Sequence, residues 1–169
     1  YLQQDMREFE LYGTVRAIVS VCDSMNYLIC PEDFEKVLKL AANYLDYNGV
    51  FLFDVNTPHK YAQILSDNTF AENREDCSFI WENDYDPDTC INTYALTMYV
   101  QDAGEQGTFR RFEEVHEQRA YSVDEIRKLV ASSGLELLEV YGGFVKSEPR
   151  MDSERLCFLL RRPEPDNEK

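Results

Sequence analysis

The sequence predicts an α/β fold in which a parallel β-α-β unit is followed by an antiparallel sheet. Val15–Val21 is rich in β-branched residues, which is typical of a strand buried on both faces. Apolar residues recur at helical spacing from Phe34 to Leu45, and Val50–Phe53 forms a second apolar run. A strand, a helix and a strand joined by short links indicate a right-handed parallel crossover.

Helix signals set the expected limits of this first unit. Pro31 suits the first helical position, where its missing N–H costs nothing. Asn48-Gly49 tolerates a left-handed backbone and therefore predicts the end of that helix. We expect a short helix from Asn56 to about Leu65, followed by a polar stretch as far as Asp76.

The middle of the chain changes to the pattern of an antiparallel sheet. Three segments have the alternating apolar pattern of β-strands: Ser78–Tyr85, Ile91–Gln101 and Thr108–Tyr121. Turn-forming residues join them at 86–88 and 102–107. We therefore expect three antiparallel strands with one face toward solvent.

The last third returns to the α/β pattern. Ser122-Val123-Asp124-Glu125 is a capping box that begins a helix. Leu135–Tyr141 and Arg155–Leu160 are expected to pair as antiparallel strands at a sheet edge. The predicted organisation is an α/β core at 1–75 and 122–162, an antiparallel insert or lid at 76–121, and a disordered tail at 163–169.

The charge balance argues against two classes of partner. The 169 residues carry a formal net charge of −15, and such a surface repels nucleic-acid phosphates and anionic membranes alike. The longest apolar runs are also far shorter than a membrane span. We expect neither nucleic acid nor a membrane as a partner.

The cysteines favour a reducing compartment. The five residues form neither a CxxC motif nor a zinc-ligand spacing, and the chain opens without a signal-peptide pattern. Reduced thiols in the cytoplasm are the simplest interpretation.

Asp84, Asp86 and Asp88 alternate without the glycine and distal glutamate of a calcium loop, so they indicate a turn, and no metal site is expected.

Three stretches, taken in order, resemble the motifs of one enzyme family. They are Gln4–Arg7, Val19–Leu28 and Gly49–Pro58. Together they resemble the second half of a class I S-adenosylmethionine-dependent methyltransferase. With Arg110–Tyr121 included, the chain is similar to bacterial small-molecule methyltransferases that carry an antiparallel insert over the site.

This resemblance implies a partial Rossmann-like sheet, about strands four to seven of seven, with the last strand antiparallel, plus the three-stranded insert. It also implies that strands one to three, with the glycine-rich loop and the acidic ribose-binding residue, precede the part present here. The seven glycines never form GxGxG. Because that loop lets backbone amides approach the cofactor, we expect an incomplete enzyme.

The resemblance also implies the cofactor S-adenosylmethionine and places Asp5 and Met6 at its adenine. A carboxylate can accept from the exocyclic amine, and a thioether can lie against the ring. Without the motif order, an exposed Asp and an ordinary core Met would explain both residues. The predicted cofactor-binding set is Gln4, Asp5, Met6, Val21, Cys22 and Asp23.

The loop after the first strand is the expected acceptor side. Ligands of open α/β sheets bind outside the carboxyl ends of the strands. This places Asp23, Asn26 and Tyr27 near the methyl group or its acceptor. A turn or cap role for Asp23 and a packing role for Tyr27 remain open.

Methyl transfer is an in-line displacement, so the protein mainly aligns the reacting atoms and excludes water. A general base is needed only if the acceptor arrives protonated. The candidate catalytic residues are His116, on the insert, and Tyr27, although a hydrogen-bonding strand histidine is the simpler interpretation of His116. Aromatic residues of the insert region either line an acceptor pocket or pack in the core: Phe79, Trp81, Tyr85, Tyr94, Tyr99, Phe109, Phe112 and Tyr121.

The sequence therefore predicts S-adenosylmethionine-dependent methyl transfer to a small-molecule acceptor. The alternative is a non-catalytic interaction fragment of methyltransferase origin. The strand at Val15–Val21 would present an unpaired edge, which predicts a homodimer or a complementing amino-terminal segment there. A dinucleotide-dependent oxidoreductase has less support, because neither a glycine fingerprint nor a hydride-handling constellation is present.

Overall fold

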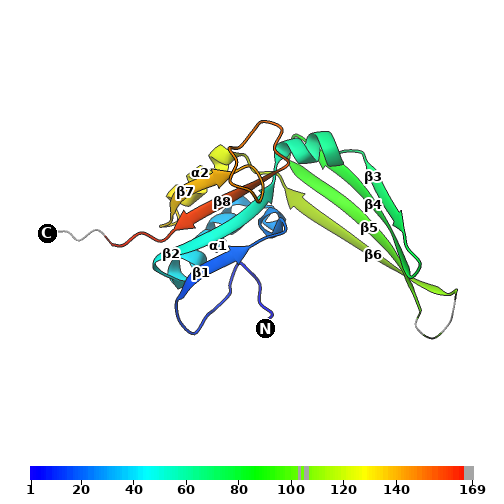
Figure 1. Ribbon diagram of the computed structural model, residues 1–169, viewed down its shortest axis with the longest axis horizontal. Coiled ribbons are helices and arrows are strands. Elements are labelled where there is room, and N and C mark those ends of the chain that lie inside the picture. The colour runs from blue at the N-terminus through cyan, green and yellow to red at the C-terminus, as the bar shows by residue number, and fades with distance from the viewer. Residues whose placement is uncertain (103, 105–106, 166–169) are drawn as a thin grey trace.

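The computed structural model describes residues 1–102, 104 and 107–165, which form two four-stranded sheets (Figure 1). In the core sheet, of order β1-β2-β8-β7, β1 (Val15–Ser20) pairs parallel with β2 (Leu45–Asn56). β8 (Arg155–Arg161) runs antiparallel to both β2 and β7 (Glu136–Tyr141). The predicted parallel unit and the predicted antiparallel pairing of the final strands are confirmed.

Two helices, α1 (Pro31–Tyr44) and α2 (Val123–Ala131), cover one face of the core sheet (Figure 1). Alternate residues of β2 and β8 point into this layer, where the rings of Phe53 and Phe158 stack with centroids 5.1 Å apart. The predicted capping box begins α2. The Ser122 hydroxyl accepts from the Glu125 N–H, and the Glu125 carboxylate accepts from the Ser122 N–H.

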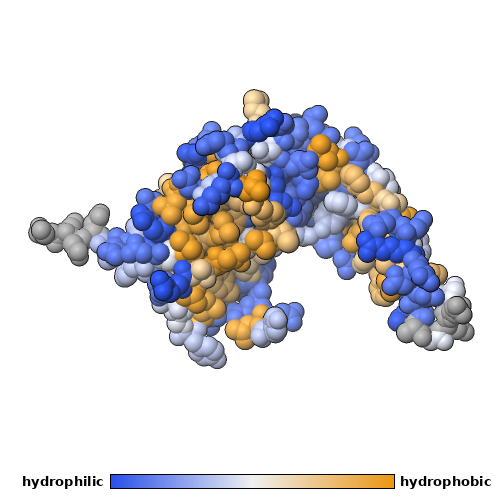
Figure 2. Space-filling view, viewed as in Figure 1, coloured by the Kyte–Doolittle hydropathy of each residue, from blue (hydrophilic) through white to orange (hydrophobic). Residues whose placement is uncertain are grey.

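The other face of the core sheet has no helix over it among the described residues. Val19, Leu52 and Leu159 are neighbours in the strand register on this face, and Val19 is 61% exposed. Figure 2 shows a broad hydrophobic surface on the core side of the molecule. The prediction that the first strand is buried on both faces is therefore wrong for the described chain, in which β1 is also an edge strand.

The insert sheet contains β3 (Thr69–Asn73), β4 (Cys77–Asp86), β5 (Ile91–Gln101) and β6 (Phe109–Arg119), all antiparallel and in sequence order. The three expected strands are confirmed, and β3 is an additional one that lies before the expected boundary at 76. Only Phe70 of β3 is partly buried, against Trp81. A strand that is otherwise exposed carries no apolar alternation, which is why the sequence indicated only a polar stretch.

The helix α1 ends at Tyr44, so the prediction that Asn48-Gly49 ends it is wrong. Leu45 is fully buried and already pairs with Val15, while the residues after it bulge out of the ladder before Val50 resumes it. Asn48 does adopt a left-handed backbone (φ 63°), but within this irregularity of β2. Burial of Leu45 against the core thus ends the helix earlier than its capping residues suggest.

The short helix expected after Asn56 includes the π-helical turn η2 (Lys60–Leu65), in which the Ser66 N–H donates to the Tyr61 carbonyl. The expected turn at 86–88 is present, with the Asp86 carboxylate accepting from the Asp88 N–H.

Of the expected tail, residues 163–165 have no regular secondary structure, and 166–169 lie outside the described residues. No helix in the described part of the chain is long and apolar enough to cross a bilayer.

Candidate functional site

The carboxyl ends of β1 and β2 bring two aspartates together. Asp23 follows β1, and its backbone N–H donates to Oδ2 of the fully buried Asp54, near the end of β2, over 3.1 Å. Cys22 and Asp23 both have left-handed backbones, with φ of 63° and 52°. Such conformations cost non-glycine residues on the order of 1–3 kcal/mol each, so the surrounding contacts hold this turn in place.

One arginine binds both aspartates. Arg155, the first residue of β8, forms an ion pair with Asp54 through Nη1 and a 3.0 Å contact with Asp23 Oδ1 through Nη2. Oδ1 of Asp54 is buried and has no hydrogen-bond partner among the described residues. Because the guanidinium is rigid and planar, it fixes the relative positions of the two strand ends.

The insert contacts this cluster through Gln118 of β6. The Gln118 Nε2 donates to Asp23 Oδ2 over 2.8 Å, and its Oε1 accepts from the hydroxyl of Tyr61 over 3.0 Å. Burial raises the pKa of Tyr61 well above its usual range, so the phenol stays protonated and donates. Gln118 therefore ties the core loop to both the insert and η2.

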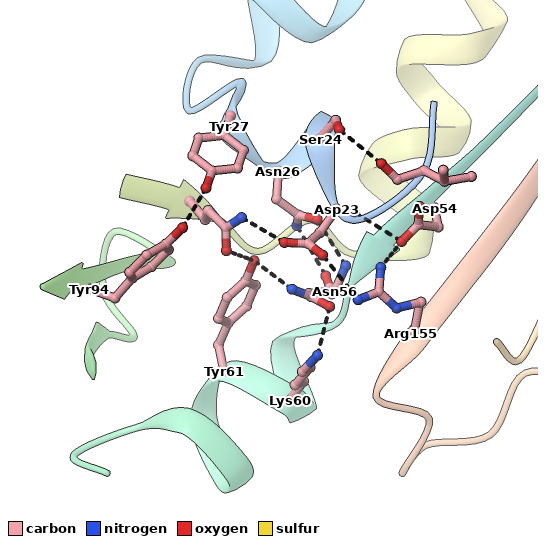
Figure 3. Close-up of polar contacts among 12 residues, drawn as sticks. Asp23, Ser24, Asn26, Tyr27, Asp54, Asn56, Lys60, Tyr61, Tyr94 and Arg155 are labelled. Atoms are coloured by element: carbon pink, nitrogen blue, oxygen red, sulfur yellow. Dashed lines mark hydrogen bonds and ion pairs between the residues drawn. The ribbon is translucent and has the colours of Figure 1, made fainter. Parts of the chain in front are cut away.

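A second set of bonds fixes the turn η1 (Ser24–Tyr27). Asn26 is fully buried; its Nδ2 donates to the Arg119 carbonyl over 2.8 Å, and its Oδ1 accepts from the Asn56 N–H over 2.9 Å. The Lys60 ammonium donates to Asn56 Oδ1 over 3.1 Å (Figure 3). The bonds of the buried Asn26 amide to the Asn56 and Arg119 backbones hold the strand-end loop in place.

An aromatic cluster lies where η1 meets the insert. The Tyr27 and Tyr94 hydroxyls are hydrogen-bonded, and the Tyr94 ring stacks on His116 with centroids 4.7 Å apart. Tyr27 meets His116 edge-on at 5.8 Å, and His116 Nε2 lies 3.1 Å from Glu114 Oε2. Burial and the bond to Tyr27 raise the pKa of Tyr94. The structure therefore brings the two predicted catalytic candidates together.

A cleft of about 520 Å³ opens between the core and the insert. Asp23, Gln118 and Arg155 contribute its polar side, and Phe79, Trp81 and Met98 of the insert contribute its apolar side. Of the other aromatic residues considered, Tyr94 lines the cleft, Tyr121 is in the core, and Phe109 and Phe112 are exposed. The insert aromatics therefore divide between pocket, packing and surface.

The predicted adenine residues lie in a separate hollow of about 360 Å³, where Asp5, Met6 and Tyr27 are among the lining residues. The Asp5 carboxylate is held by the Arg7 guanidinium at 2.6 and 3.0 Å, which lowers the pKa of Asp5 well below its usual range. It is exposed and has lone pairs left to accept an amine. The side chain of Gln4 instead bonds the backbone of Glu10 in both directions.

The loop at 21–27 runs between the two hollows. Val21 and Cys22 are exposed, and the Val21 carbonyl accepts from the Ser24 hydroxyl over 2.9 Å. Asp23 faces the 520 Å³ cleft, whereas Tyr27 lines the 360 Å³ hollow. The loop therefore separates the two hollows, and no GxGxG sequence occurs in the chain.

Several polar residues of the site were not identified from the sequence. Asp54 follows an apolar strand as Asp23 does, so the strand-end rule could have found it. Arg155 and Gln118 had no local signal, since they lie 132 and 95 residues from Asp23 in the chain. Lys60 and Tyr61 are placed by the π-helical turn, which the sequence pattern did not indicate.

The comparisons with known proteins agree with this fold. No family model matches the chain. "Putative methyltransferase YqeM" from Bacillus subtilis (strain 168) is 37% identical over 163 residues, which are 96% of this chain and 65% of the relative. A second "Putative methyltransferase", from Geobacillus sp. (strain WCH70), is 28% identical over 169 residues and is also covered to 65%.

A crystal structure of an S-adenosylmethionine-dependent methyltransferase from Clostridium acetobutylicum ATCC 824 superposes with a TM-score of 0.86 at 28% identity. The match covers 95% of this chain and 63% of that one. The chain is similar in sequence and in fold to class I S-adenosylmethionine-dependent methyltransferases. The methyltransferase CcbJ from Streptomyces caelestis, at 15% identity and a TM-score of 0.77, shares the fold. The chain spans about two thirds of the length of these methyltransferases, and the predicted fold class is confirmed.

Proposed function

We propose that this chain takes part in S-adenosylmethionine-dependent methyl transfer to a small-molecule acceptor bound in the 520 Å³ cleft. One observation carries the proposal: two parallel strand ends, joined through Arg155, open onto a cleft whose other wall is the insert. Ligands of open α/β sheets bind at such strand ends. The methyltransferase names of the relatives support the same chemistry.

The chain's own residues orient and enclose the reactants. S-adenosylmethionine, when bound, supplies an activated methyl group. Arg155 and Gln118 hold Asp23 at the cleft, and Tyr94, which lines the cleft, is hydrogen-bonded to Tyr27 of the adjoining hollow. Such preorganisation contributes to rate because the reacting atoms need not be brought into line during the reaction.

If the acceptor arrives protonated, His116 is the proposed base and Tyr27 its neighbour at the acceptor. Glu114 beside Nε2 favours a proton on that nitrogen, which leaves the other ring nitrogen able to accept one. The His116 ring stacks on Tyr94, which itself lines the cleft. In this proposal Asp5 and Met6 bind the adenine, and Val21, Cys22 and Asp23 line the rest of the cofactor.

We also propose that β1 pairs with a further strand, from a complementing segment or from a second copy of the chain. Its edge has no partner strand in the described residues, and Val19 beside that edge is 61% exposed. Such an added strand would bring further backbone to the cofactor side of the loop.

The five free cysteines support a reducing cytoplasmic setting.

Calorimetric titration with S-adenosylhomocysteine, paired with the solution mass, tests the proposed function. We expect micromolar binding, and we expect Asp5→Asn to weaken it about tenfold, since hydrogen bonds to charged groups contribute roughly 1.5–3 kcal/mol. Asp88→Asn, in an exposed turn of the insert, is the matched control. A folded chain that does not bind would instead favour the non-catalytic interaction fragment.

The edge pairing has its own test. Val19→Lys should shift a dimeric or complemented species toward the monomer, because a lysine on an edge strand opposes further pairing. Val115→Lys, on the exposed insert strand β6, is the control. A wild-type monomer with an unprotected β1 edge in hydrogen exchange would contradict the pairing.

A further inference from the structure

We infer that the cleft selects an acceptor in which an anionic group is attached to an apolar body, and that Lys60 binds the anion. The inference deepens the proposed function and rests on it, because it names the class of acceptor for the same cleft. Three features of the cleft carry it: the state of its acids, the free donors of Lys60 and the apolar wall opposite.

Asp23 is the acid that lines the cleft, and both of its carboxylate oxygens already have partners. Asp23 Oδ1 accepts from Arg155, and its Oδ2 accepts from Gln118. Asp54 is fully buried below and is ion-paired with the same arginine. A cationic acceptor would therefore have to displace existing bonds to reach a carboxylate, which disfavours amines as the charged part of the ligand.

Lys60 has the opposite character. An ammonium has three donors, and the one bond recorded for Lys60 Nζ in the described chain goes to the neutral Oδ1 of Asn56. No ion pair among the described residues involves Lys60, although the chain as a whole is strongly acidic. Its side chain lines the cleft, so its remaining donors are available to a carboxylate or phosphate.

The wall of the cleft away from these charges is apolar. Phe79, Leu96 and Met98 are half-buried side chains on adjacent strands of the insert, and Phe79 and Met98 are direct partners in the register. Trp81 and Tyr94 meet edge-on, with centroids 5.7 Å apart, at the side of this wall. A flat ring or short aliphatic chain on this wall would bury apolar surface while its anionic end reaches Lys60.

Trp81 makes the inference directly measurable because it is the single tryptophan of the chain and lines the cleft. Its fluorescence should report titrations with hydrocinnamate, with hydrocinnamamide and with phenylpropylamine, which share one apolar body and differ in charge. We expect hydrocinnamate to bind about tenfold more tightly than the amide, as for a hydrogen bond to a charged group, and the amine to bind most weakly.

The variant Lys60→Gln should abolish the preference for hydrocinnamate over the amide while leaving amide binding unchanged. Lys128→Gln, an exposed lysine on α2, is the matched control and should keep the full preference. Far-UV circular dichroism of both variants checks that the fold is retained.

Equal binding of acid and amide, tightest binding of the amine, a preference that survives Lys60→Gln, or no response to any of the three compounds would each overturn the inference. None of these titrations contains a cofactor. A negative result in these three titrations therefore does not affect the S-adenosylhomocysteine result. Conversely, absence of S-adenosylhomocysteine binding would contradict the proposed function without changing the affinities for the three compounds.

Discussion

The two sheets of this molecule are built in opposite ways. The core sheet buries one face against α1 and α2, and in β8 the residues Leu156, Phe158 and Leu160 are all buried. In the insert strand β6 almost every side chain is exposed or half-exposed, and Val115 is 71% exposed. The difference indicates that the core supplies most of the free energy of folding, because burial of apolar surface is the main stabilising contribution and the insert strand buries little of it.

The junction between the sheets is polar rather than apolar. Gln118 and the Arg119 carbonyl of β6 bond to Asp23 and Asn26 of the core, and the small apolar cluster beside them is centred on Tyr61. Hydrogen bonds fix orientation but contribute little net stability each. We therefore expect the insert to open at a lower free energy than the core.

The largest expected effect is a cavity in the core. Phe53 is fully buried and contacts the rings of Phe34, Phe51 and Phe158. Phe53→Ala should lower the free energy of unfolding by about 3–5 kcal/mol, the usual cost for a buried aromatic residue. Urea denaturation followed by circular dichroism measures it. Val115→Ala in the insert should change stability by less than about 0.5 kcal/mol, and equal effects would contradict the comparison.

Next in size is the loss of the arginine that joins the strand ends. Arg155→Leu leaves Asp54 buried without its counter-charge, which should lower the free energy of unfolding by about 3 kcal/mol. This is the low end of the range for a broken buried ion pair, because the Arg155 side chain is 20% exposed. Thermal and urea unfolding measure it. The double variant Asp54→Asn with Arg155→Leu should recover part of the loss, since the uncompensated charge is removed. A double variant no more stable than Arg155→Leu would show that the charge is not the cause.

A smaller and local effect is expected at the junction. Gln118→Ala leaves the buried Tyr61 hydroxyl without its acceptor, at a cost of about 1–3 kcal/mol. Hydrogen exchange should quicken in β6 and η2 while β8 stays protected. Gln101→Ala, at the far end of the same sheet, is the control. Uniform acceleration across both sheets would instead mean that the junction is part of the global fold.

The smallest expected effect is at the cap of α2. Burial alone would raise the pKa of Glu125, but the Ser122 N–H and hydroxyl and the Arg119 ion pair outweigh it, so the folded pKa lies below the usual value. The associated stability is present above the unfolded pKa and is lost as pH falls through the folded one. Ser122→Ala should cost about 1 kcal/mol near neutral pH and less in acid. Melting temperatures from about pH 7 to about pH 3 test this; a cost that grows in acid would contradict it.

The sequence predicted what depends on local pattern. The capping box at Ser122, the parallel β1-α1-β2 unit and the antiparallel β7–β8 pair were all predicted, because each has a periodicity or an end signal within a short window. Asp23 and Tyr27 were predicted as site residues from their place after a strand, and the structure puts them at the cleft and the adjoining hollow.

The rest was decided by contacts between distant segments. The sequence around Arg155 and Lys60 has no pattern that indicates a site. Both residues reach the cleft only when β8 and η2 fold against the ends of β1 and β2. Leu45 ended α1 early because the core buries it, and β3 formed because β4 offered it a free edge. The sequence by itself determined the elements that have a local pattern and the family likeness. The tertiary structure decided which charged groups of the cleft are paired, since charge pairing depends on distance in space and not along the chain.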